Sequence, residues 1–148
     1  MEQQAREIAK KAMEQGYNCC EAVLMAADKI WQLHLSPDTY AAAACFEKGM
    51  GSGCSCGALV GIVMISGILA RKHMHPLGKE LAPYLYEKFL EQFGSSCCRT
   101  LRNKRTLSQR IGSRGCRELT GAAAALMVNT WQEVLTWENG DLLDIKYE

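Results

Sequence analysis

The sequence predicts an all-α protein, a single compact domain of about six helices that spans residues 1–148. Apolar residues recur at the three- and four-residue spacing of helices in one segment after another, and no alternating strand pattern recurs. Aromatic residues make up only 7% of the chain, which is low for a β-sandwich. The length suits one domain of ordinary size, and no internal repeat or linker divides it.

Helix-start and helix-stop residues define two helices at the N-terminus. The first is expected over residues 2–13, with an apolar stripe on one face, and Gly16 can end it. Asn18 and Glu21 have the spacing of a capping box, in which each residue satisfies a backbone N–H of the other. This pattern predicts the start of a second helix whose apolar residues continue as far as Leu33.

A glycine-rich loop separates the third and fourth expected helices. The Ser-Pro-Asp run at residues 36–38 predicts the start of a helix that continues to about residue 48. The glycines of residues 49–53 then either make a flexible loop or let the backbone approach another group closely. Ser55 is expected to cap a fourth helix over residues 56–72, which is apolar nearly all round and therefore central.

Two further helices are expected before the basic part of the chain. The first covers residues 79–93 and ends at Gly94, and Pro83 either delays its start or kinks it. The second is short, covers residues 97–101 and can be capped by Ser96. Both expectations follow from helical spacing bounded by residues that start or stop helices.

The last third of the chain is expected to hold one long helix. Residues 102–113 are polar and basic, which is typical of a loop. Ser113 can then cap a helix from near residue 116 to residue 137. The tail, residues 142–148, could be extended.

Net charge and hydropathy exclude several classes of protein. The formal net charge is only +1, so no overall charge attracts the chain to nucleic acid. The longest apolar stretch, residues 57–70, is shorter than the roughly 20 residues that a membrane span needs. The N-terminal segment is charged and lacks the apolar region of a secretory signal. We therefore expect no membrane insertion and a cytoplasmic location.

The most informative feature is the number of cysteines, eight in 148 residues. Because the cytosol keeps thiols reduced, these cysteines favour metal binding or redox chemistry over a disulfide scaffold. Cys45 follows Ala41 and Ala44 inside an expected helix and is interpreted as core packing. Six others lie at expected helix starts, where the positive end of the helix dipole stabilises a thiolate. These six are Cys19, Cys20, Cys56, Cys97, Cys98 and Cys116.

The order of these cysteines resembles that of a known family. Cys19 follows Gly-Tyr-Asn, residues 56–61 read Cys-Gly-Ala-Leu-Val-Gly, Cys98 precedes Arg-Thr-Leu, and Cys116 opens the last helix. This pattern resembles the redox-active family named for the signature C, CGAxxG, C, C (the C_GCAxxG_C_C family). The resemblance extends from about residue 5 to residue 135.

The resemblance implies redox activity and a centre built from one cysteine of each signature element. Those metal-ligating candidates are Cys19, Cys56, Cys98 and Cys116. A related domain in split-Soret cytochromes is associated with an iron–sulfur cluster, which makes such a cluster the candidate cofactor. The CxxCH motif is absent, so no haem is expected. Cys45, Cys54 and the second member of each doubled pair depart from the family pattern, and they leave each ligand of a pair ambiguous by one residue.

Several chemistries are open to four cysteines at separate helix starts. Four thiolates can hold a [2Fe–2S] or [4Fe–4S] cluster, which would serve electron transfer. Zinc also takes four thiolates, but zinc sites usually contain close CxxC pairs, which this chain lacks. Without metal, the same residues could act as a thiol–disulfide oxidoreductase or redox sensor. A third alternative is a helical interaction module whose cysteines are merely buried. Whether the protein is itself an oxidoreductase is open.

A strongly basic segment lies between Cys98 and Cys116. Residues 99–117 hold seven basic residues and no acidic residue, so the rest of the chain carries +1 − 7 = −6. The segment is either a solvated loop or an anion site for the cluster, an acidic redox partner protein or a small anionic ligand. Arg99 and Arg117 adjoin cysteines and are the expected cofactor-binding residues. Nucleic acid is not expected because aromatic residues are not interleaved. The apolar fourth helix would also suit a homodimer.

Overall fold

Helices make up the described structure. The structure, a computed structural model, describes residues 1–137 of the chain. Over that range it contains eight α-helices and no β-strand, which confirms the all-α class and corrects the expected number of about six. The helices are α1 (Glu2–Glu14), α2 (Cys19–Trp31), α3 (Pro37–Ala43), α4 (Gly57–Lys72), α5 (Leu81–Phe93), α6 (Cys98–Asn103), α7 (Leu107–Arg110) and α8 (Arg114–Val134).

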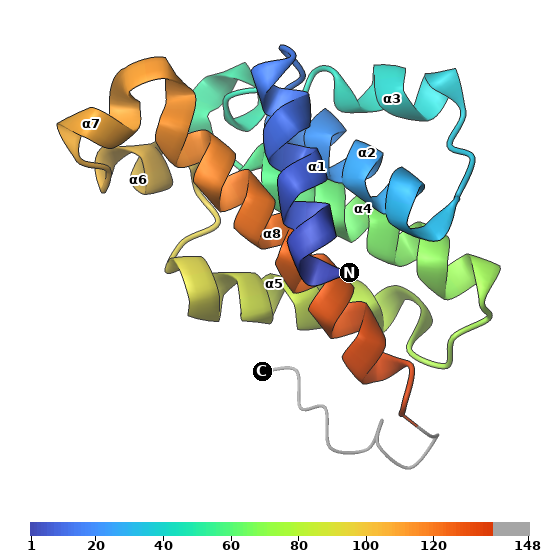
Figure 1. Cartoon of the computed structure of the whole chain (residues 1–148). Helices are drawn as coiled ribbons and strands as arrows, with labels where there is room; N and C mark the ends of the chain where they lie inside the picture. Colours follow the sequence, from blue (N-terminus) through green and yellow to red (C-terminus); the bar gives the residue numbers. More distant parts are fainter. Residues whose placement is uncertain (138–148) are drawn as a thin grey trace.

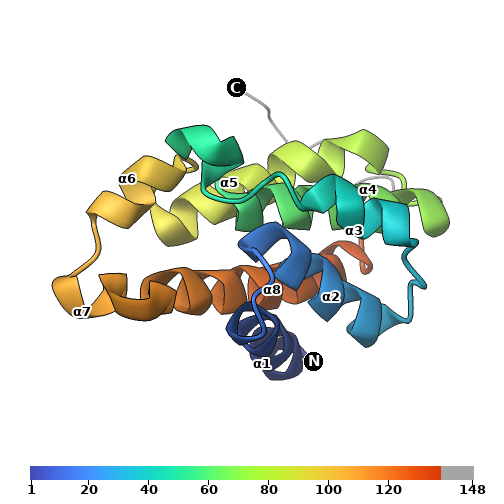
Figure 2. The ribbon, with the colours of Figure 1, turned by 90° about the horizontal axis from the view of Figure 1, so that it is seen from above.

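The long helix α8 runs through the middle of the molecule, with other helices packed on both of its sides (Figures 1 and 2). Helices α1 and α2 pack against α8 and against each other. Helix α4 packs against both α2 and α8, and α5 packs on α4 and α8. The short helices α6 and α7 lie near the N-terminal end of α8 (Figure 1). This arrangement brings the first turns of several helices to one end of the molecule.

The buried core lies where α2, α4, α5 and α8 face one another. Its largest fully buried side chains include Leu24, Ile62, Ile65, Phe89 and Met127. Most residues of α4 are buried, as the apolar composition of that segment predicts. Each such side chain contributes about 1.5–3 kcal/mol to stability by leaving water. The stability of the fold therefore comes mainly from this apolar body.

Several predicted helix ends are confirmed. The capping box at the start of α2 is present, because the Glu21 backbone N–H donates to Asn18 and the Asn18 backbone N–H donates to Glu21. The Asn18 amide also donates to the Ala44 carbonyl oxygen at 2.9 Å, which ties this start to the end of α3. Gly94 ends α5 with a φ of +81°, a conformation that glycine adopts without strain. Pro83 lies in the first turn of α5, where it needs no hydrogen-bond partner.

The starts of α4 and α6 differ from the predicted ones by one residue. The capping positions are Cys56 and Cys97, and not Ser55 and Ser96 as expected. The reason is a contact between the two starts, since Ser55 and Cys97 form an antiparallel β-bridge. The Cys56 backbone N–H donates to the Ser96 carbonyl oxygen at 2.8 Å within this bridge. Backbone pairing between distant segments thus takes the place of serine caps.

The basic segment is less irregular than predicted. A single turn, α7, lies inside residues 102–113, and its capping box joins Thr106 with Gln109. Ser113 occupies the capping position of α8 in a left-handed conformation and makes no side-chain cap, and α8 ends at Val134 before the expected residue 137. The tail over residues 142–148 lies outside the described residues. Among the helices of residues 1–137, none has the length and hydropathy to cross a membrane.

Candidate functional site

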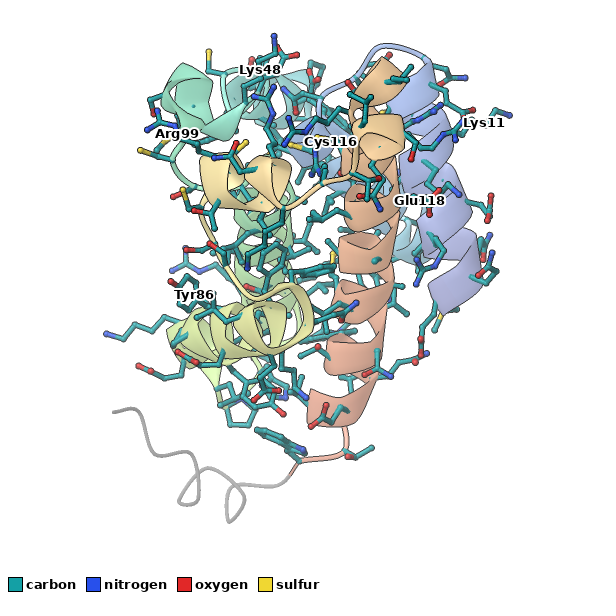
Figure 3. The ribbon with its side chains drawn as sticks, turned by 90° about the vertical axis from the view of Figure 1, so that its left-hand side faces the viewer. Lys11, Lys48, Tyr86, Arg99, Cys116 and Glu118 are labelled. Atoms are coloured by element: carbon teal, nitrogen blue, oxygen red, sulfur yellow. The ribbon has the colours of Figure 1, made fainter. Side chains whose placement is uncertain are left out.

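Four helix starts surround one cavity of about 1010 Å³ at the same end of the molecule. Each start contributes one cysteine to the wall: Cys19 in α2, Cys56 before α4, Cys98 in α6 and Cys116 in α8. Figure 3 places Lys48, Arg99 and Cys116 at this end, with Tyr86 of α5 farther along the molecule. The four cysteines that the sequence predicts as ligands therefore line one shared space, although up to 97 residues separate them in the chain.

The two glycines of the Cys-Gly-Ala-Leu-Val-Gly run let α4 pack closely on the start of α2. A Cβ atom on Gly57 would overlap the Cys19 sulfur and the Phe46 carbonyl oxygen. One turn later, a Cβ atom on Gly61 would lie 3.0 Å from the Val23 Cβ and 3.1 Å from the Cys20 carbonyl oxygen. The glycines of the motif thus hold the Cys19 thiol beside the N-terminus of α4.

The glycine-rich loop between α3 and α4 forms another part of the wall. It makes one wide turn, η1 (Gly49–Gly53). Lys48, which precedes the turn, and Met50, which lies in it, adopt left-handed φ angles of +52° and +60°. Residues other than glycine rarely adopt this backbone conformation, and such strain is concentrated at functional sites. Gly49 packs against the Cys98 side chain, where a Cβ atom would lie 2.8 Å from the Cys98 Cβ. Of the two readings of this loop, the close approach of backbone to another group is the one that holds.

Burial and mutual repulsion raise the pKa of three cavity thiols, those of Cys19, Cys56 and Cys98. Burial is the main cause that raises the pKa of Cys19, and the neighbouring Cys56, Cys116 and Cys98 raise it further. The pKa of Cys56 is raised by burial, against hydrogen bonds from the Leu59 and Ala58 backbone, and is raised also by Cys98 and Cys116. Electrostatic interactions join all six pairs of the four sulfurs. Four thiolates here would repel one another unless positive charge accompanied them.

Two arginines of the basic segment interact with the cavity sulfurs. The Arg105 guanidinium donates to the Cys116 sulfur at 2.8 Å. Burial, and then Cys116, raises the pKa of Cys98, while the positive charges of Arg102 and Arg105 oppose this. Arg102 and Arg105 were not among the expected cofactor-binding residues. Arg102 follows Cys98 by four residues on one helix face, a spacing that could have identified it.

The two arginines that the sequence singled out, Arg99 and Arg117, also line the cavity, but their hydrogen bonds in the described structure go to oxygen atoms. Arg99 donates to the Ser52 carbonyl oxygen at 2.9 Å and so braces the glycine-rich loop. Arg117 forms an ion pair with Glu14 of α1 at 3.2 Å. Their role in binding a cofactor stays a prediction.

The remaining cysteines lie outside the cavity wall. Cys20 is fully buried in the core, with its sulfur 3.8 Å from that of Met64. Cys97 places its sulfur 3.3 Å from the Gly53 carbonyl oxygen, and Cys54 is exposed. Cys45 is also exposed, so its interpretation as core packing was wrong. The reason is that α3 ends at Ala43, earlier than expected, and leaves Cys45 in the turn beyond it.

In residues 1–137 no three His, Cys, Asp or Glu side chains are arranged to hold a single metal ion. The donor set is nevertheless rich in thiols, with four sulfurs on one wall and arginines beside them. Its chemistry suits a group that binds several thiolates and carries negative charge overall.

Comparison with known proteins identifies the family but adds no relative. No curated protein and no solved structure matches the chain. Residues 17–130 match the family described as "Putative redox-active protein (C_GCAxxG_C_C)". The matched range includes all four cavity cysteines and most of the eight helices. The resemblance seen in the cysteine pattern is therefore confirmed, and the chain belongs to the C_GCAxxG_C_C family of redox-active proteins.

Proposed function

We propose that this protein transfers electrons through an iron–sulfur cluster held by Cys19, Cys56, Cys98 and Cys116. The observation that carries the proposal is the convergence of four helix starts, each with one cysteine, on one arginine-lined cavity. Because the cytosol keeps thiols reduced and available as ligands, we place this function in the cytoplasm.

A cluster and a single metal ion require different spacings of four thiols. A tetrahedral ion with metal–sulfur bonds of about 2.3 Å would bring four sulfurs to about 3.8 Å from one another. A cluster of several irons distributes its four cysteines around a larger body and needs no such close group. Since iron is cationic, it also turns the mutual repulsion of four thiolates into attraction. The first point favours a cluster over a single ion, because no close group of three ligands is present in residues 1–137, and the second favours a bound metal over metal-free thiolates.

The arginines would tune the centre. A bound iron–sulfur cluster supplies one-electron redox chemistry and becomes more negative when it is reduced. Arg105 donates a hydrogen bond to Cys116, and the positive charges of Arg102 and Arg105 act on Cys98. Positive charge and hydrogen bonds at the ligand sulfurs stabilise the reduced state and raise the reduction potential. The chain would thus hold the cluster and set the energy at which it accepts an electron.

Anaerobic reconstitution tests the proposal. The reduced protein is incubated with ferrous iron and sulfide, and its visible spectrum and its iron and acid-labile sulfide contents are then measured. We expect a brown protein, with the colour lost in Cys56→Ser because an alkoxide is a poor substitute for a thiolate on iron. Cys45→Ser should keep the colour, because Cys45 is exposed and lies outside the cavity.

Other outcomes would support the alternatives. A colourless protein that forms reversible disulfides among the same four cysteines would support metal-free thiol–disulfide exchange. A colourless protein whose thiols stay unreactive and bind no metal would contradict a redox role and leave a helical interaction module.

A further inference from the structure

The cavity wall carries more positive charge than is required to balance a cluster bound by the four cysteines. It holds six basic side chains and two carboxylates, a net charge of +4. The basic side chains are Lys48, Arg99, Arg102, Arg105, Arg110 and Arg117, and the carboxylates are Glu14 and Glu47. Of the six, only Arg117 forms an ion pair within residues 1–137. Arg99 and Arg110 instead donate to backbone carbonyl oxygens. Neutral partners hold these guanidinium groups in place and leave their charge unopposed.

A buried hydroxyl also lacks a partner in the same cavity. Thr120 lines the wall one helical turn after Cys116, is fully buried, and its hydroxyl oxygen makes no hydrogen bond in the described structure. Leaving such a group unsatisfied costs about 1–3 kcal/mol. A polar occupant that reaches this hydroxyl would satisfy it, and this observation is independent of the arginines.

We propose that the cavity binds a small dianion, a molecule with a phosphate, sulfate or dicarboxylate group, on Lys48, Arg99 and Arg102 and beside Thr120. Guanidinium groups bind such oxyanions through paired hydrogen bonds. The charge of the ligand rests on the proposed function, because a cluster with four thiolates contributes roughly −2 and leaves an excess of about +2. The anion site itself exists whether or not a cluster is bound.

The recessed shape favours a small molecule over an acidic partner protein. The cavity volume of about 1010 Å³ lies near the upper end of the range for small-molecule sites. A convex protein surface could neutralise the exposed arginines, but it would leave the buried Thr120 hydroxyl without a partner. The site would therefore hold a dissolved anion next to the sulfurs.

Calorimetric titration with inorganic phosphate at fixed ionic strength tests this site. The reduced, iron-free protein is used, so that failure of the cluster and failure of the anion site are separate results. We expect saturable binding that weakens about fivefold or more in Arg99→Gln and in Lys48→Gln. Arg71→Gln is the charge-matched control, because Arg71 is exposed in the last turn of α4 and lies outside the cavity. Its affinity should change less than twofold.

A second pair of variants tests the hydroxyl. Thr120→Val should keep the fold and weaken phosphate binding, because its hydroxyl has no partner in the protein to lose. Thr130→Val is the matched control, since the Thr130 hydroxyl is also buried without a partner but lies outside the cavity. Absence of saturable binding would overturn the proposal, as would equal weakening in Arg71→Gln and Arg99→Gln. Binding of polyglutamate but not of phosphate would overturn it in favour of an acidic protein.

Discussion

Two regions of this molecule differ in how their charged and polar groups are paired. One is the cavity end, where four helix starts meet, and the other is the helix body, the packed helices away from the cavity. In the body, charged and aromatic groups have partners: Glu133 binds Lys88 at 3.0 Å and also Tyr84, and Trp131 packs against the rings of His73 and His75. At the cavity end, four thiols lie near one another, the backbone is strained, and five of the six basic side chains form no ion pair within residues 1–137. From this difference we infer that the body stabilises the fold. The strain and unpaired charge of the cavity end indicate a binding site for a ligand or cofactor.

The largest expected effect is in the body. Phe89→Ala removes a fully buried ring that packs on Phe93 with ring centroids 4.5 Å apart. Loss of a buried aromatic ring destabilises a protein by about 3–5 kcal/mol, so urea denaturation should show a drop of that size. Cys116→Ser at the cavity end should change the free energy of unfolding far less. Equal losses in the two variants would contradict the division between body and cavity end.

The next effect compares two glycines of the same helix. Gly57→Ala should cost about 1–3 kcal/mol and prevent iron loading, because the new Cβ would displace the Cys19 thiol. Gly67→Ala has open space around it and should stabilise the protein by about 0.5–1 kcal/mol without changing iron loading. Thermal unfolding and iron content measure both effects. Normal iron content in folded Gly57→Ala would remove the packing explanation of the motif.

A smaller effect is expected from the charge network of the body. Burial alone would raise the pKa of Glu133, but hydrogen bonds from Tyr84 and Lys88 and the charge of Lys88 outweigh it and hold that pKa below its usual value. A lowered folded-state pKa stabilises the protein above the unfolded pKa, and this stability is lost as pH falls through the folded value. Glu133→Gln should therefore cost less than about 1 kcal/mol at neutral pH. Denaturation curves of variant and wild type should converge in acid; a constant gap down to acid pH would show that charge is not the cause.

The smallest effect is expected at the rim of the cavity. Glu14→Gln removes the carboxylate partner of Arg117 and adds one net positive charge to the wall. Phosphate affinity should rise about twofold, the size expected for an exposed ion pair. Glu118→Gln is the control, since it makes the same charge change on α8 outside the cavity, where Glu118 pairs with Lys10. An unchanged affinity in Glu14→Gln would mean that Arg117 takes no part in anion binding.

The parts of the fold that the sequence predicts correctly are those that depend on local signals, the residues that start or stop a helix. The capping box of Asn18 and Glu21 and the stop at Gly94 depend on residues within one turn, and both are present as predicted. The placement of cysteines at helix starts follows from the same signals. Because every start that carries a cysteine points to one end of the bundle, the four candidates line one cavity.

Contacts between distant segments explain what the sequence does not predict. Ser55 caps no helix because it pairs with Cys97, a residue 42 positions away. The single turn α7 is too short for a recognisable apolar stripe. Arg105 reaches Cys116 only through the turn between α6 and α8. The early end of α3, and with it the exposure of Cys45, follows a residue run with no local stop signal.

The most direct test of the central claim uses two adjacent cysteines. Cys19 lines the cavity, whereas Cys20 is buried in the core beside Met64. A proposed ligand and a packing residue are therefore consecutive in the chain. The measurement is the iron and acid-labile sulfide content per chain after anaerobic reconstitution of Cys19→Ser and Cys20→Ala. The account predicts loss of both from Cys19→Ser and retention of both in folded Cys20→Ala. Full iron and sulfide in Cys19→Ser, with loss in folded Cys20→Ala, would contradict it.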